Sequence, residues 1–237
     1  MIWLLRLFCK VTWMPYLRDR VFVLKNEPFR EHDARIVMYG REHGKLVAVA
    51  RGMRRMGAKQ LGHLEPLSQA DVMVAVGQSF DKLAVAQAVE PRVGLRDDLG
   101  AMAVLGPLSH LIESLTREGV ADVSIYELLQ ESSDLWRSTD QLPSPERGRL
   151  ILAAASLRLL DALGEAPDFD AIEQGDMPEG VMTLLRFMRL RPLRDLLAIT
   201  APSTLFVATS AVIETAVERT PLATRLHGAA TIYALLA

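Results

Sequence analysis

The stretch REHGKLVAVARGMRRMGAK at residues 41–59 holds six basic side chains and one acidic one, although the whole chain has a formal charge of −2. Arginine and lysine at this density can bind the phosphates of a nucleic-acid backbone without reading the bases. Glycines at positions 44, 52 and 57 permit a tight turn and a flexible loop that would present these side chains. An ordinary solvated loop is the alternative. We predict nucleic-acid contacts by Arg41, Arg51, Arg54, Arg55 and Lys59.

Charge is distributed unevenly along the chain. Residues 14–91 hold 12 basic and 9 acidic side chains, whereas residues 92–176 hold 7 basic and 16 acidic ones. Residues 177–237 hold 6 basic and 4 acidic side chains. The near-neutral total therefore conceals a basic first part, which the net charge alone would hide.

The basic stretch lies among five short, valine-rich segments separated by turn signals such as Glu27-Pro28 and His43-Gly44. These segments predict strands at residues 19–26, 34–40, 45–51, 70–76 and 82–89. Five short strands this close together are typical of a small closed or nearly closed barrel. His43-Gly44 would then form the turn before the third strand, and GMRRMGAK would form a basic loop after it.

After Pro91 the apolar residues recur at helical spacing, with acids near the predicted helix starts. Helices are predicted at residues 99–116, 124–136 and 150–164. We therefore expect a multidomain α+β protein, with a barrel domain at residues 14–91 and an α-helical domain at residues 92–237.

The apolar run MIWLLRLFCKVTW at residues 1–13 has three interpretations: a signal peptide, a packed N-terminal element, or codons upstream of the true start. The run is too short to span a bilayer, is interrupted by Arg6 and Lys10, and lacks a cleavage site. We favour an upstream extension with a start at Met14, and we expect no membrane association.

The sequence offers little for catalysis or metal binding. Cys9 is the single cysteine, and the five histidines show no ligand spacing. No phosphate-binding loop or G-x-S-x-G motif is visible, and the acid pairs at 97–98 and 168/170 suit a helix start and a loop. We expect a protein that is not an enzyme and has no cofactor or metal, and a reducing compartment is consistent with the single cysteine.

Four aromatic residues fall within the predicted barrel, where stacking on bases would require an outward-facing ring. Phe22 alternates with valines and is expected in the core. Tyr39, beside Gly40 at a strand end, is the candidate for base stacking. Phe29 and Phe80 are the other two.

A second basic cluster lies in LLRFMRLRPLRDLL at residues 184–197, where apolar residues interleave with arginines and Pro192 interrupts the helix. An amphipathic helix with a solvated basic edge is the simpler interpretation. A groove of this composition would also suit an acidic peptide that ends in a hydrophobic residue. The candidate partner-binding residues are Arg186, Arg189, Arg191 and Arg194.

The segments at residues 21–55 and 61–77 carry a resemblance to a known family. They include Glu31 and Asp33, Arg41–Gly44, the Val49–Gly52 strand end with Arg54, and the GHLEPL segment at 62–67. This order resembles the N-terminal domain of the RecO family of bacterial recombination mediators. The helix end and turn LRLLDALGEAPDF at 157–169 is similar, more weakly, to the C-terminal domain of that family.

The resemblance implies an OB-fold barrel followed by a helical domain, in a non-catalytic protein of DNA repair. It implies binding to single- and double-stranded DNA, strand annealing, and loading of RecA with the partner RecR onto DNA coated with single-stranded DNA-binding protein (SSB). The acidic C-terminal tail of SSB is the expected peptide partner, and the cytoplasmic nucleoid the expected location. An OB-fold module for RNA or a protein partner remains the alternative.

One departure concerns zinc, which many family members bind through cysteines after the turn at 157–169. Here the chain continues as FDAIEQGDMPEG, without cysteine or histidine. Carboxylates such as Glu173 and Asp176 do not replace thiolates in a tetrahedral structural site. We expect no zinc site.

Overall fold

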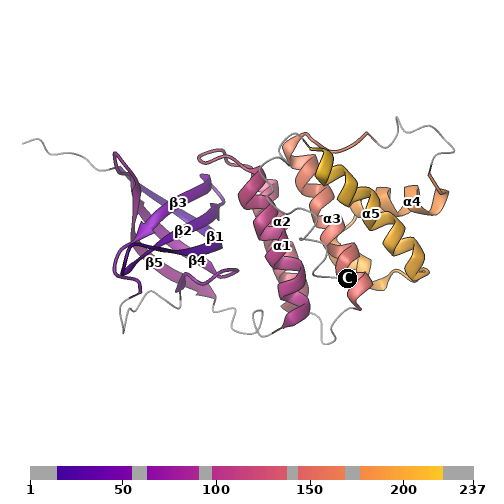
Figure 1. Cartoon of the computed structure of the whole chain (residues 1–237), viewed down its shortest axis with the longest axis horizontal. Coiled ribbons are helices and arrows are strands. Elements are labelled where there is room, and N and C mark those ends of the chain that lie inside the picture. Colours follow the sequence, from indigo (N-terminus) through magenta and orange to yellow (C-terminus); the bar gives the residue numbers. More distant parts are fainter. Residues whose placement is uncertain (1–14, 55–62, 91–97, 138–143, 169–176, 221–237) are drawn as a thin grey trace, which may run out of the picture.

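A computed structural model of the chain describes residues 15–54, 63–90, 98–137, 144–168 and 177–220. A small barrel lies at one end of the molecule and a helical part at the other, with α1 and α2 next to the barrel (Figure 1). The expected fold class, an OB-fold barrel followed by helices, is confirmed. The expected start extension at residues 1–13 lies outside the described residues.

The barrel has five strands: β1 (Tyr16–Phe29), β2 (Asp33–Gly40), β3 (Gly44–Ala50), β4 (Gln69–Ala75) and β5 (Asp81–Glu90). They close in the order β1-β2-β3-β5-β4, and only the short β3–β5 pairing is parallel. All five predicted strands are present. The predicted turn between β2 and β3 is also confirmed, since Arg41, Glu42 and His43 connect these strands.

Strands β1 and β2 bury both of their faces. Val21, Val23 and Ile36 point into the barrel, where they form one hydrophobic cluster with other strand residues. Phe22 and Tyr39 point the opposite way and join a second cluster formed mainly by the helices. Because side chains alternate between the faces of a strand, this double burial requires nearly continuous apolar runs such as VFVL and IVMY.

The helical part contains α1 (Leu99–Leu115), α2 (Val123–Arg137), α3 (Pro145–Leu163), α4 (Glu179–Leu190), the 3-10 helix η2 (Leu193–Ala198) and α5 (Ser203–Arg219). The predicted role of the acids at 97–98 is confirmed for Asp98, whose carboxylate accepts a hydrogen bond from Ala101 N at 2.9 Å as the N-cap of α1. Pro192 separates α4 from η2, as predicted.

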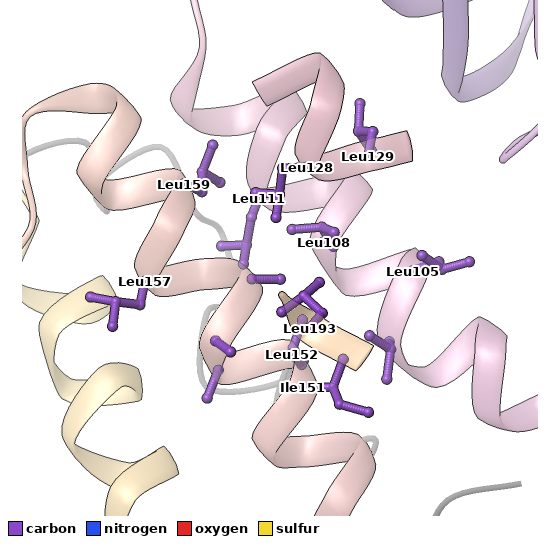
Figure 2. Packing of buried hydrophobic residues seen from close by; sticks show 14 of the residues in the cluster. Leu105, Leu108, Leu111, Leu128, Leu129, Ile151, Leu152, Leu157, Leu159 and Leu193 are labelled. Carbon is purple, nitrogen blue, oxygen red and sulfur yellow. The ribbon is translucent and has the colours of Figure 1, made fainter. Parts of the chain in front are cut away.

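Helix α3 is the centre of the helical core. Its residues from Leu150 to Leu160 are almost entirely buried, and they pack against α1 on one side and α5 on the other. Leucines from α1, α2, α3 and η2 point toward one another in this core (Figure 2). Burying one leucine stabilises the fold by about 1.5–3 kcal/mol, so this cluster is the main source of helical-domain stability.

Polar contacts join the barrel to the helices. Lys45 Nζ donates to Glu113 O at 2.7 Å and to Thr116 O, so this cation caps the C-terminal end of α1. The Tyr39 hydroxyl donates to Asp122 O at 3.3 Å and accepts from Asp122 N at 3.2 Å. The Phe22 and Tyr126 rings lie 5.2 Å apart between centroids. These contacts fix the barrel against α1 and α2.

Gly44 is required where the β2–β3 turn packs closely against Val120. Its φ of +65° is left-handed, and an added Cβ would lie 2.0 Å from the carbonyl oxygen of Val120.

Within the described part of the chain, no helix is long and apolar enough to cross a membrane.

We predict that Gly44→Ala destabilises the protein by more than the roughly 1–2 kcal/mol that a left-handed backbone costs a non-glycine residue, because the clash with Val120 adds to that strain. Gly119→Ala is the matched control, since its φ is +72° but no atom lies within 4 Å of the added Cβ. Urea denaturation of both variants measures the difference. Equal destabilisation would show that Gly44 serves only the turn.

Candidate nucleic-acid interface

Two loops converge at the end of the barrel where β2 begins and β3 ends. They are the β1–β2 turn at residues 30–32 and the β4–β5 loop at residues 76–80. The rings of Phe29 and Phe80, at the margins of these loops, lie 6.3 Å apart between centroids with an edge-to-face angle of 63°. OB-folds bind oligonucleotides through these two loops and the neighbouring face of β2 and β3. This end of the barrel is therefore the candidate interface.

Two cations lie over the aromatic pair. The guanidinium carbon of Arg30 is 5.2 Å from the Phe29 centroid and 5.7 Å from the Phe80 centroid. Lys82 Nζ is 5.8 Å from the Phe80 centroid. All three separations fall within the range of attraction between a cation and the negative face of an aromatic ring.

The first part of the predicted basic loop joins this site. Gly52 N donates to the Asp33 carboxylate at 2.8 Å, and Arg54 N donates to His32 O at 3.0 Å. The loop is thereby fixed to the β1–β2 turn, with the side chains of Arg51 and Arg54 exposed. We call Arg30, Arg51, Arg54 and Lys82 the basic rim. Arg55 and Lys59 lie outside the described residues.

None of the four rim cations has an ion-pair partner among the described residues. Asp33 accepts from Gly52 N instead of pairing with Arg51, and Asp81 accepts from Gly77 N at 3.0 Å. Glu27 is bound by Lys25 and Arg35, whose hydrogen bonds and charges hold the pKa of its carboxyl below the ordinary value. The rim charges are therefore available to an anionic ligand.

A groove adjoins the rim. It runs between the β4–β5 loop and the outer face of β2 and β3, and its lining includes Phe29, Arg35, Val47, Val49, Phe80 and Glu118. The rest of that face is covered by α1 and α2. The groove is thus the part of the β2–β3 face that remains open to a ligand.

The expectation that Tyr39 stacks on a base is wrong. Its side chain has 0% exposure and packs in the cluster between the barrel and the helices. Burial also raises the pKa of its hydroxyl above the ordinary value. The sequence pattern indicated a ring at a strand end, but it did not predict that the helices would cover this ring. Phe22, expected in the core, is buried as predicted.

Arg41 is exposed but is not brought together with Arg51 and Arg54. These residues flank opposite ends of β3, about 20 Å apart at the usual rise per strand residue. Arg41 instead lines a shallow surface with Arg18, Arg20, Glu42 and Asp71, where basic and acidic groups alternate. Arg20 is held by Asp71 at 2.8 Å. This surface lacks the excess of positive charge found at the rim.

The predicted partner-binding arginines lie around α4 and η2. Arg189 pairs with Asp161 at 2.8 Å, and Arg194 approaches Asp195 at 4.0 Å. Arg186 and Arg191 are exposed to solvent. A separate apolar groove is lined by Leu184 and Phe187 of α4, Ile199, and Leu205 of α5, with Glu179, Gly180 and Thr183 at its margin, and its lining includes none of these four arginines.

The described residues include no group of three or more histidine, cysteine, aspartate or glutamate side chains placed to hold a metal ion. Of the second acid pair, Asp168 is described and Asp170 is not.

Sequence reasoning missed Arg30 and Lys82, and it did not assign a role to Phe29 or Phe80. One signal was present in the sequence, namely that Phe29-Arg30 follows the strand predicted at residues 19–26 and Phe80 precedes the strand predicted at residues 82–89. The proximity of the two rings could not be predicted, because it depends on the crossover that brings β5 next to β3.

Comparison with known proteins identifies the barrel. Residues 14–92 match the family model described as recombination protein O N terminal. The chain is 33% identical over 149 residues to a DNA repair protein RecO of Symbiobacterium thermophilum, covering 63% of this chain and 57% of the relative. It is 32% identical over 161 residues to a DNA repair protein RecO of Cutibacterium acnes, covering 65% and 63% respectively. The chain thus spans less than two thirds of the length of these curated relatives.

Arg30 has a left-handed backbone, with φ of +57°. We predict that Arg30→Gly is more stable than Arg30→Ala by about 1 kcal/mol, because both variants lose the cation but only glycine relieves the strained backbone. Urea denaturation of the two variants measures this difference. An alanine variant as stable as the glycine variant would show that the turn carries no strain at this position.

Proposed function

Because residues 14–92 of this chain match the family model described as recombination protein O N terminal, we propose that the protein binds DNA at the basic rim and acts as a non-catalytic mediator of recombinational DNA repair. The observation that carries the proposal is the basic rim itself: four cations without described ion-pair partners surround the open end of an OB-fold barrel. Both single- and double-stranded DNA are ligands in this proposal, since both present phosphates to the rim.

The rim favours contacts with phosphates over readout of base edges. Its charges lie on short loops and at the start of β5 around a groove, and no helix of the described chain projects from the barrel in a way that would enter a major groove. Binding through phosphates is independent of sequence and decreases steeply with salt. A repair mediator must act on any sequence, so this mode of binding fits the proposed role.

The wider activity rests on the similarity to the RecO family. We include strand annealing and, with RecR, loading of RecA onto SSB-coated single-stranded DNA in the cytoplasm at the nucleoid. The apolar groove between α4 and α5 supports one part of this role. Its apolar walls suit the hydrophobic residue that ends the acidic tail of SSB, although the charged residue in its lining is Glu179 and the arginines of α4 and η2 lie outside it.

We predict that Arg51→Ala and Arg54→Ala each weaken binding to single-stranded DNA, and each lowers the slope of log affinity against log salt by roughly 0.7 for one lost phosphate contact. The loss should be similar for different DNA sequences. Stability should change by less than about 0.5 kcal/mol, because both side chains are exposed. Binding titrations over a series of salt concentrations provide the measurement.

Arg18→Ala is the matched control, since Arg18 is exposed on the same barrel but lies on the surface of alternating charge. Its salt slope should remain that of the unmodified protein. Unchanged binding in an Arg51→Ala, Arg54→Ala double variant would contradict the proposed interface. Stronger binding to structured RNA than to DNA would favour the alternative of an RNA-binding module.

We predict that Leu205→Asp abolishes binding of an SSB tail peptide, because the new carboxylate repels the acidic peptide and places a charge in the apolar groove. Annealing of SSB-coated complementary strands should slow, while annealing of naked strands is retained. Val207→Asp, on the same helix but 42% exposed and outside the groove, is the control. Normal peptide binding by the Leu205 variant would place the tail site elsewhere.

A further inference from the structure

We propose that Phe29 and Phe80 form a stacking site for an unpaired nucleobase, and that Arg30 covers the two rings when no strand is bound. This inference rests on the proposed function and assigns it a preferred ligand, the exposed base of single-stranded DNA. The phosphate contacts of the basic rim do not distinguish one strand from two. The aromatic pair would provide that distinction.

The two rings are not needed for the hydrophobic core. Neither Phe29 nor Phe80 belongs to the cluster inside the barrel or to the cluster between the barrel and the helices. Both side chains are only partly buried, and both line the open groove. Large aromatic residues kept at a groove margin and outside the core are available to a ligand.

The geometry of the pair suits a planar ligand. At 63° and 6.3 Å the rings meet edge to face, so each ring keeps a face that is not covered by the other. The Arg30 guanidinium lies near both rings, at 5.2 Å and 5.7 Å from their centroids. A guanidinium is a flat group that stacks on aromatic faces much as a base does. Arg30 therefore marks where a base would stack.

Arg30 can leave the rings because no described carboxylate holds its guanidinium. When a base takes its place on a ring, the freed guanidinium can bind the adjacent phosphate, with Lys82 remaining over Phe80. No charge is buried without a partner in this exchange. The bases of a duplex are already paired and stacked on each other, so they would have to separate before entering the site. The stacking contact consequently favours single strands.

The test uses the full chain and three probes: an oligothymidylate of about 16 nucleotides, near the upper site size of an OB-fold, the same backbone with abasic residues, and a duplex of equal length. The abasic strand keeps the phosphates but lacks the bases. We expect the unmodified protein to bind the thymidylate strand at least about fivefold more tightly than the abasic strand, the lower limit for one stacked base.

Phe80→Leu keeps an apolar side chain of similar volume but removes the ring. This variant should lose most of the preference for the base-bearing strand while keeping the affinities for the abasic strand and the duplex. Phe80→Tyr should retain the preference, because the ring remains. Val85→Ala is the control, as Val85 is 46% exposed on β5, the strand that follows Phe80, and lies outside the groove.

A Phe80→Leu variant that binds all three probes as the unmodified protein does would overturn the stacking site. So would a variant weakened equally on all three, because a disturbed fold or lost phosphate contact does not select for bases. Arg30→Gly provides a second measurement: it uncovers the rings and should keep the base preference while weakening all three probes. If the unmodified protein bound none of the probes, the proposed function itself would fail.

Discussion

Phe22, Val37 and Tyr39 point out of the barrel and are buried against α1 and α2, and the arrangement of the whole molecule depends on this contact. The face that an OB-fold commonly offers to a nucleic acid is here half covered by the protein's own helices. Among the described residues, the groove beside the β1–β2 turn and the β4–β5 loop is the part of this face that stays open. The same burial that stabilises the two-part structure thus limits the ligand to one groove.

Lys45 shows how a basic residue can serve the fold instead of a ligand. It belongs to the basic stretch at residues 41–59, yet its ammonium group is bound to carbonyl oxygens at the end of α1. The free carbonyls and the negative end of the helix dipole attract this cation. Charge density in a sequence therefore overstates the charge presented to a partner, because part of it is neutralised by the helix ends it contacts.

The acidic middle of the chain is compatible with the proposed DNA binding because its ion-paired acids lie within the helical part. Glu131 pairs with Arg158 at 2.7 Å and Asp161 pairs with Arg189 at 2.8 Å, both within the helical part. At the barrel end, Asp33 and Asp81 accept hydrogen bonds from backbone N–H groups and Glu27 is held by Lys25 and Arg35, whereas Glu31 stays exposed beside His32. Over distances beyond about 8–10 Å, salt screens the remaining helical charge from the rim. The barrel can accordingly attract an anion although the chain is net negative.

The sequence by itself determined the five strands, the first three helices and the β2–β3 turn, because hydrophobic period and glycine position act locally. The family resemblance added the OB-fold, since VFVLKNEPF and VAVARGMRR occur in a characteristic order. Only the tertiary structure decided which outward-facing aromatic stays accessible. Tyr39 is covered by α2, whereas Phe29 and Phe80, far apart in the chain, meet at the open groove. Burial and long-range proximity depend on how strands close and helices dock, and no local pattern encodes either.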